Sequence, residues 1–198
     1  MSKVKVYGIQ RSGNNWLMWM LEANYRVKVM GSNYGWTHGA YSDDKEVEDA
    51  LNIVISKHPI EWLPSMQRFH KKHHGLTLGQ FIRDSDSIEQ WNSLYLGHIS
   101  NAEKYKARFV RYDDLLRDPE TVLDNLIDGA FQRKDRPFRS AENQHMSTRM
   151  KPTSREFDKN QYLEKHYLKK YTKEELEEVT SRIDWGVAGS LGYEKEKI

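Results

Sequence analysis

Residues 4–16 constrain this chain most, because they combine a buried strand, a glycine turn and the start of a helix. They read Val-Lys-Val-Tyr-Gly-Ile-Gln-Arg-Ser-Gly-Asn-Asn-Trp. In such a turn the backbone N–H groups and the positive end of the helix dipole converge, which makes a cradle for phosphate. Arg11 adds a fixed charge with a planar set of donors. The triphosphate-binding pattern G-x-x-x-x-G-K-[ST] is absent, so another phosphate ligand is expected.

Three apolar runs predict strands, at residues 3–9, 51–56 and 107–112. A helical pattern follows each of them: at residues 15–22, after Pro59, and after Asp118, which is placed to cap a helix beginning at a proline. Strands that alternate with helices predict an α/β fold with three layers and a central, mostly parallel sheet. At 198 residues, we expect a single domain spanning residues 1–198.

The remaining segments give weaker signals. Residues 31–46 are rich in Gly, Ser and Asp, and residues 132–160 in Arg, Lys and Ser, so both are predicted to be loops, the second partly mobile. Residues 70–75 interrupt the helical pattern, and a polar helical region follows over roughly 77–105. A capping box from Thr172 to Glu175 predicts the start of the last helix.

Composition excludes several classes of function. The net charge is only +2, which gives no case for binding nucleic acid. Cysteine is absent, which excludes disulfides, thiolate catalysis and cysteine-based zinc sites. No apolar run approaches the length of a membrane span, and the N-terminal residues lack the apolar core of a signal peptide. We therefore expect a cytoplasmic protein with no membrane partner.

Basic residues follow the first two predicted strands. Arg11 and Lys57 lie where those strands end, and His38 lies on the loop between them. Ligands of parallel α/β sheets bind outside the carboxyl ends of the strands. The sequence therefore predicts an anion site at this edge, with a histidine beside it.

Together these segments resemble the family of sulfotransferases that use 3′-phosphoadenosine 5′-phosphosulfate (PAPS). Residues 10–16 resemble the family's 5′-phosphosulfate loop, [KR]-S-G-T-T-W, and Lys57 with Ser65 eight positions later resembles its 3′-phosphate motif. Thr37-His38 resembles a Thr-His pair whose histidine is the catalytic base. Residues 109–115 with Asp118-Pro119 resemble a Y-E-D-L…D-P segment, and residues 191–193 resemble common C-terminal endings.

The resemblance implies a role for each matching residue. Arg11 stabilises the leaving phosphate, and His38 takes the acceptor's proton. Lys57 and Ser65 hold the 3′-phosphate. PAPS is the donor and 3′-phosphoadenosine 5′-phosphate (PAP) the product, with no metal, and the acceptor is a hydroxyl or amine of a small molecule or glycan. The backbone N–H groups that would hold the 5′-phosphate are those of Ser12, Gly13, Asn14 and Asn15. The aromatic rings that would contact adenine are those of Trp16 and Tyr112. Trp16 and Tyr112 are explained about as well by packing in the core.

The chain departs from the family pattern at three places. Asn14 and Asn15 replace the usual threonines, which removes two hydroxyls from the loop. Lys57 replaces the usual arginine, so a single point charge takes the place of a bidentate contact to phosphate. The family's Arg-Lys-Gly motif is not found, and Arg149 and Lys151 are the nearest candidates for it. The identity of the acceptor, the oligomeric state and whether residues 132–160 form a lid all stay open.

Two other functions fit parts of the pattern. A small-molecule kinase is one, with Asp113 and Asp114 after the third strand as candidate magnesium ligands. A nucleotide-binding module without catalysis is the other, and it would need no base. His58 competes with His38 as the base. His70, His73 and His74 invite a metal site, but the H-E-x-x-H pattern is missing, and a solvated basic helix end explains them better.

Overall fold

The computed structural model describes residues 2–140, 144–146 and 152–195 of the chain. A four-stranded sheet lies at its centre, in the order β2-β1-β3-β4, and every pair of neighbours is parallel. The strands are β1 (Ser2–Tyr7), β2 (Val27–Val29), β3 (Leu51–Ser56) and β4 (Arg108–Arg111). The predicted parallel α/β architecture is confirmed, and β2 is an additional strand at one edge.

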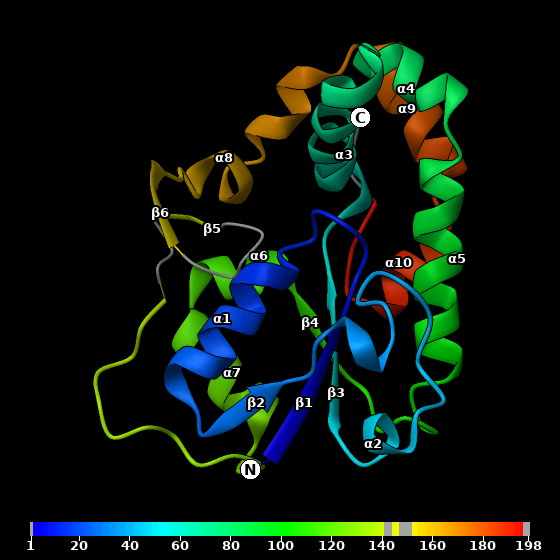
Figure 1. Ribbon diagram of the computed structural model, residues 1–198. Helices are drawn as coiled ribbons and strands as arrows, with labels where there is room; N and C mark the ends of the chain where they lie inside the picture. Colours follow the sequence, from blue (N-terminus) through cyan, green and yellow to red (C-terminus); the bar gives the residue numbers. More distant parts are fainter. Residues whose placement is uncertain (1, 141–143, 147–151, 196–198) are drawn as a thin grey trace.

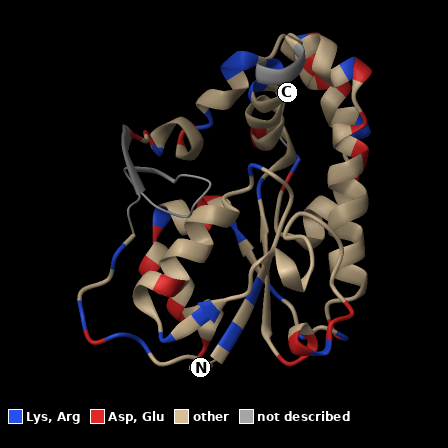
Figure 2. Ribbon diagram, in the orientation of Figure 1, with Lys and Arg blue, Asp and Glu red and all other residues tan. Residues whose placement is uncertain are grey.

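Helices cover both faces of the sheet, which gives the three predicted layers (Figure 1). One face carries α1 (Asn14–Asn24), α6 (Tyr112–Arg117) and α7 (Pro119–Ile127). Along the opposite face lie α5 (Ser87–Ser100) and α10 (Trp185–Ser190). The same core continues beyond the carboxyl ends of the strands into α3 (Pro59–His74), α4 (Leu78–Asp84) and α9 (Lys173–Arg182). Figure 2 shows acidic and basic residues side by side on the outer helices.

Alternation along the strands explains the two cores. In β1, Val4 and Val6 pack with α1 and α7, whereas Tyr7 packs with α5 on the other face. In β3, Ile53 likewise joins the first core and Val54 the second. Successive residues of a strand point to opposite faces, so a continuous apolar run is what a strand buried on both sides requires.

Local helix signals are confirmed where the predicted caps form. Asp118 accepts a hydrogen bond from the backbone N–H of Thr121, and Pro59 occupies the first turn of α3. The capping box at Thr172 and Glu175 is present in both directions. These are interactions within one turn, so the sequence alone specifies them.

Three predictions about segments were wrong. Helix α3 continues through residues 70–74 and ends at Gly75, whose φ of 72° is left-handed. Residues 132–160 are not all loop, because they contain the antiparallel strands β5 (Gln144–Met146) and β6 (Pro152–Glu156). A further helix, α10, follows the predicted last helix, with Asp184 as its cap.

The connecting segments contain short helical turns. These are η1 (Ser32–Tyr34), α2 (Lys45–Glu48), α8 (Asn160–Leu163) and η2 (His166–Lys170). Residues 31–46 are otherwise the predicted loop. Arg149 and Lys151 lie outside the described residues. In the described part of the chain, no helix has both the length and the apolar character that a bilayer span needs.

Candidate functional site

The carboxyl ends of β1, β3 and β4 meet at one edge of the sheet, and they carry the predicted site residues. The loop after β1 spans residues 8–13 and leads directly into α1. Three of its residues have positive φ: Gly8, Arg11 and Gly13, at 156°, 69° and 101°. A β-carbon at Gly8 would lie 2.4 Å from the carbonyl oxygen of Ile55, so only glycine allows the loop to pass this close to β3.

The carbonyl groups of this loop are held by donors from the interior. The Ser12 hydroxyl donates to the carbonyl of Ile9 at 2.6 Å, and the Asn14 amide donates to the same carbonyl at 3.0 Å. The Trp62 indole of α3 donates to the carbonyl of Gln10 at 2.6 Å. Within the loop, the N–H of Gly8 donates to Thr37 and the N–H of Ser12 donates to Ile9. The candidate N–H groups for a phosphate are therefore those of residues 13–15, at the N-terminus of α1.

These contacts divide the predicted cradle into two kinds of residue. The side chains of Ser12 and Asn14 are buried and brace the loop, so neither faces solvent. Arg11 is exposed, and within the described residues its guanidinium makes no ion pair. Gly13 caps α1 without a side chain, and Asn15 is half-buried on its first turn.

His38 is attached to this loop through Gly8. Its Nδ1 lies 2.7 Å from the Gly8 carbonyl oxygen, and the Gly8 N–H donates to the carbonyl of Thr37 at 3.0 Å. A ring nitrogen that contacts a carbonyl must carry the proton, so Nδ1 is the donor and Nε2 is the basic nitrogen. Burial lowers the pKa of His38, and the bond to Gly8 opposes this effect.

The loop that carries His38 is anchored from beneath. Lys5 of β1 is fully buried, and its ammonium donates to the carbonyls of Gly31 and Gly35 at 3.0 and 2.6 Å. Burial lowers the pKa of this lysine. Trp36 is 60% exposed and meets the His38 ring edge-on, with centroids 5.6 Å apart. An exposed indole therefore lies beside the candidate base.

His58, the competing candidate base, has both ring nitrogens engaged. Nδ1 accepts from the backbone N–H of Ile60 at 3.3 Å and caps α3, which fixes the proton on Nε2. Nε2 lies 3.3 Å from the carbonyl of Glu194. This geometry gives His58 a structural role.

Lys57 is enclosed in a buried pocket of its own. Its ammonium lies 3.0 Å from Oε1 of Glu61, in the first turn of α3, and 98% of the Lys57 side chain is removed from solvent. The same nitrogen lies 4.3 Å from the ring centroid of Tyr112 and 3.9 Å from that of Tyr162 on α8. Burial raises the pKa of Glu61, and the nearby Lys57 acts in the opposite direction.

Ser65 and the two predicted adenine-contact residues lie around this pocket. Ser65 is buried on α3 and accepts a hydrogen bond from Arg68 at 3.1 Å. Trp16 is 7% exposed, and its indole donates to the carbonyl of Ser140 at 2.6 Å. The Trp16 and Tyr112 rings meet edge-on at 5.9 Å. Trp16 and Tyr112 both belong to the core that β1 and β3 share with α1, α6 and α7.

Several residues of this arrangement were not predicted. Gly8 and Trp62 shape the loop, and Glu61 pairs with Lys57. Lys57 precedes α3 and Glu61 lies in its first turn, and this spacing of four residues is a signal that the sequence does contain. Tyr162 is distant in sequence from every predicted site residue, so no local pattern identifies it.

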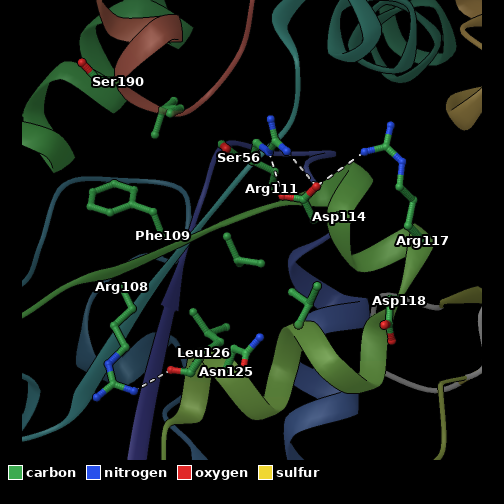
Figure 3. Close-up of a pocket in the computed structure, with 13 residues that line it drawn as sticks. Ser56, Arg108, Phe109, Arg111, Asp114, Arg117, Asp118, Asn125, Leu126 and Ser190 are labelled. Atoms are coloured by element: carbon green, nitrogen blue, oxygen red, sulfur yellow. Dashed lines mark hydrogen bonds and ion pairs between the residues drawn. The ribbon is translucent and has the colours of Figure 1, made fainter.

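A pocket of about 730 Å³ lies elsewhere, along the free edge of β4 (Figure 3). Arg111 forms a bidentate ion pair with Asp114 there, at 2.7 and 2.8 Å. Arg117 lies 3.6 Å from the same carboxylate. Asp114, one of the two candidate magnesium ligands, is therefore bound by arginines. Across the described residues, no cluster of His, Cys, Asp or Glu is arranged to hold a metal ion.

Comparisons with known proteins give a distant likeness. No model of a protein family matches the chain, and no curated protein matches it. Among solved structures, the chain is similar to a sulfotransferase domain from the curacin biosynthetic pathway, with 19% identity and a TM-score of 0.39. The match covers 74% of this chain and 55% of that domain. A likeness this distant identifies neither a family nor an activity.

Proposed function

We propose that this chain is an enzyme that transfers a sulfuryl group from PAPS to a hydroxyl or amine acceptor. The observation that carries the proposal is the attachment of His38 to Gly8 at 2.7 Å. It ties a histidine with a basic Nε2 to the loop that is built to receive a phosphate. A base held at a fixed place beside the donor is what group transfer to a hydroxyl needs.

In the proposed reaction, the acceptor oxygen or nitrogen forms a bond to sulfur as the bond from sulfur to the bridging phosphate oxygen breaks. The acceptor's proton passes to Nε2 of His38. PAP leaves with the bridging oxygen, on which negative charge develops. Exposed Arg11 and the N–H groups of residues 13–15 at the start of α1 are suited to neutralise that charge, and preorganised donors of this kind are among the strongest contributions to catalysis.

Lys57 and Ser65 are assigned to the 3′-phosphate of the donor. Their burial at the end of β3 and on α3 supports this assignment, because both side chains lie beside Tyr162 at the edge of the sheet that carries the loop. The kinase alternative has less support, since Asp114 is engaged by Arg111. A nucleotide-binding module without catalysis would explain Lys57 and Ser65 but not the orientation of His38.

The proposal is tested by calorimetric titration with PAP and with ATP, each with and without magnesium. Tight binding of PAP that does not depend on magnesium is the expected result. A preference for magnesium-ATP would overturn the proposal in favour of a kinase. Transfer from labelled PAPS to a panel of phenols, alcohols, amines and sugars then separates an enzyme from a binding module.

A further inference from the structure

Tyr162 covers both residues that are assigned to the 3′-phosphate. Its ring centroid lies 3.9 Å from the Lys57 ammonium, and its phenol is hydrogen-bonded to the Ser65 hydroxyl. The Tyr112 ring closes the pocket from the other side, edge-on to Tyr162 at 5.6 Å. One aromatic side chain from α8 therefore fills the pocket of Lys57 and Ser65.

Two further cations lie around the same phenol. Arg68 lies one turn after Ser65 on α3, and its Nη2 donates to the Ser65 oxygen at 3.1 Å. Lys170 ends η2, and the next residue, Tyr171, donates its hydroxyl to the carbonyl of Ile60 at 2.6 Å, which fixes this segment against the start of α3. Neither cation belongs to the motifs in the sequence.

The charges in this cluster do not balance. Burial lowers the pKa of Lys170, and the charges of Arg68 and Lys57 lower it further. Glu61 is the carboxylate that faces Lys57, and its pKa is raised by burial. The pKa of Tyr162 is lowered: burial opposes its ionisation, but the charges of Lys57 and Arg68 and the bond from Ser65 outweigh that effect. Three cations against one buried acid stabilise an anion at the phenol oxygen.

We propose that Arg68 and Lys170 complete the phosphate site of Lys57 and Ser65, and that the Tyr162 phenol occupies the anion position until a phosphate ester displaces it. The identification of this ester as the 3′-phosphate of PAP rests on the proposed function. Entry of the nucleotide then requires α8 to move away from α3.

Binding of PAP and of adenosine 5′-phosphate to three variants, measured by calorimetry, tests this proposal. Arg68→Met and Lys170→Met should each weaken PAP roughly tenfold and leave adenosine 5′-phosphate unchanged, because one charge-assisted contact to phosphate is lost. Tyr162→Phe should bind PAP several times more tightly, since the hydroxyl that competes for Ser65 is gone. Lys71→Met and Lys169→Met remove cations from the same two segments that are exposed as Arg68 and Lys170 are, and they should change neither affinity.

The contrary outcomes are distinct. If Arg68→Met and Lys170→Met weaken both nucleotides equally or not at all, these residues do not hold the 3′-phosphate. If Tyr162→Phe weakens PAP, the phenol is a ligand for the nucleotide and does not block the site.

A wild-type chain that binds no PAP would contradict the proposed function, and inorganic phosphate then tests the site by itself. The ¹⁹F resonance of 3-fluorotyrosine at position 162, assigned by its loss in Tyr162→Phe, is followed during the titration. A shift that is abolished by Arg68→Met supports the anion site without the nucleotide. If the resonance does not shift, the proposed anion site is ruled out as well.

Discussion

The Nδ1 atom of His38 lies 2.7 Å from the carbonyl oxygen of Gly8, and the N–H of the same glycine donates to Thr37. Both backbone groups of one residue thus bind the segment that carries the histidine. The imidazole is held in one tautomer, and it cannot shift without the loop at the end of β1.

Replacing His38 should therefore separate catalysis from binding. We expect His38→Asn to lower turnover roughly 10²–10⁴-fold, the usual loss for a general base, because its amide still donates to Gly8 but accepts no proton. Calorimetry should find the affinity for PAP close to that of the wild type. His166→Asn removes an exposed histidine on η2 and is the matched control. Unchanged turnover in His38→Asn would remove His38 from the mechanism.

The pH dependence of the rate should report the same imidazole. Burial lowers the pKa of His38 below its ordinary value of 6.5. The neutral form is the base, so kcat/KM should rise with pH through the lowered pKa, with a midpoint below pH 6.5. An acid limb centred above pH 6.5 would show that another group titrates, and His38→Asn should remove the limb.

His98 should make the fold sensitive to acid. The side chain is 1% exposed, and both ring nitrogens are buried without a partner among the described residues. Burial lowers the pKa of His98 from 6.5 to about 4, so the unfolded chain binds more protons between these values. The free energy of unfolding should fall by up to about 3 kcal/mol as the pH drops from above 6.5 to 4. Denaturant titrations across this range should find a smaller fall in His98→Phe.

Removing only one partner of the Lys57–Glu61 ion pair should lower the free energy of unfolding more than removing both. Lys57→Met leaves a buried carboxylate without its partner, and losses of this kind are about 3–5 kcal/mol. The double variant Lys57→Met, Glu61→Leu removes both charges and should recover most of the lost stability. Lys173→Met breaks an exposed pair with Glu177 at the same helical spacing and should change stability little. Equal stability of the single and double variants would contradict the pairing.

Gly13 should tolerate no side chain. A β-carbon there would lie 2.5 Å from the Tyr112 ring, and the φ of 101° is strained for any other residue. We expect Gly13→Ala to lose about 1–3 kcal/mol from backbone strain, and more if Tyr112 is displaced. Gly97→Ala is the control, because no atom lies within 4 Å of the added carbon on α5; it should stabilise by about 0.5–1 kcal/mol. Unfolding in denaturant compares the two.

Much of the fold could be predicted because its signals are local. The apolar runs at β1, β3 and β4 and the caps at Asp118 and Thr172 each depend on a few neighbouring residues. Strand β2 has three residues, too few for a periodic pattern to stand out. Residues 70–74 are all histidine or lysine, so the apolar periodicity that predicts a helix is missing where α3 ends.

The site could be predicted in outline only. Strand ends placed Arg11, His38 and Lys57 at one edge, since all strands of the sheet are parallel. Which side chains face inward was not accessible from the sequence, so the bracing role of Asn14 could not be predicted. Tyr162 reaches Lys57 only through the tertiary fold. No spacing rule connects residues so far apart in the chain.

Lys5 connects β1 to the segment that carries His38. The strand that leads into the loop of residues 8–13 also holds, through one buried ammonium, the carbonyls of Gly31 and Gly35 ahead of His38. This loop and His38 are thus both anchored to β1, while Trp36 and Ala40 remain exposed beside them. Under the proposed activity, diversifying Trp36 and Ala40 alone would give a library in which the accepted substrate changes and the reaction geometry is inherited intact.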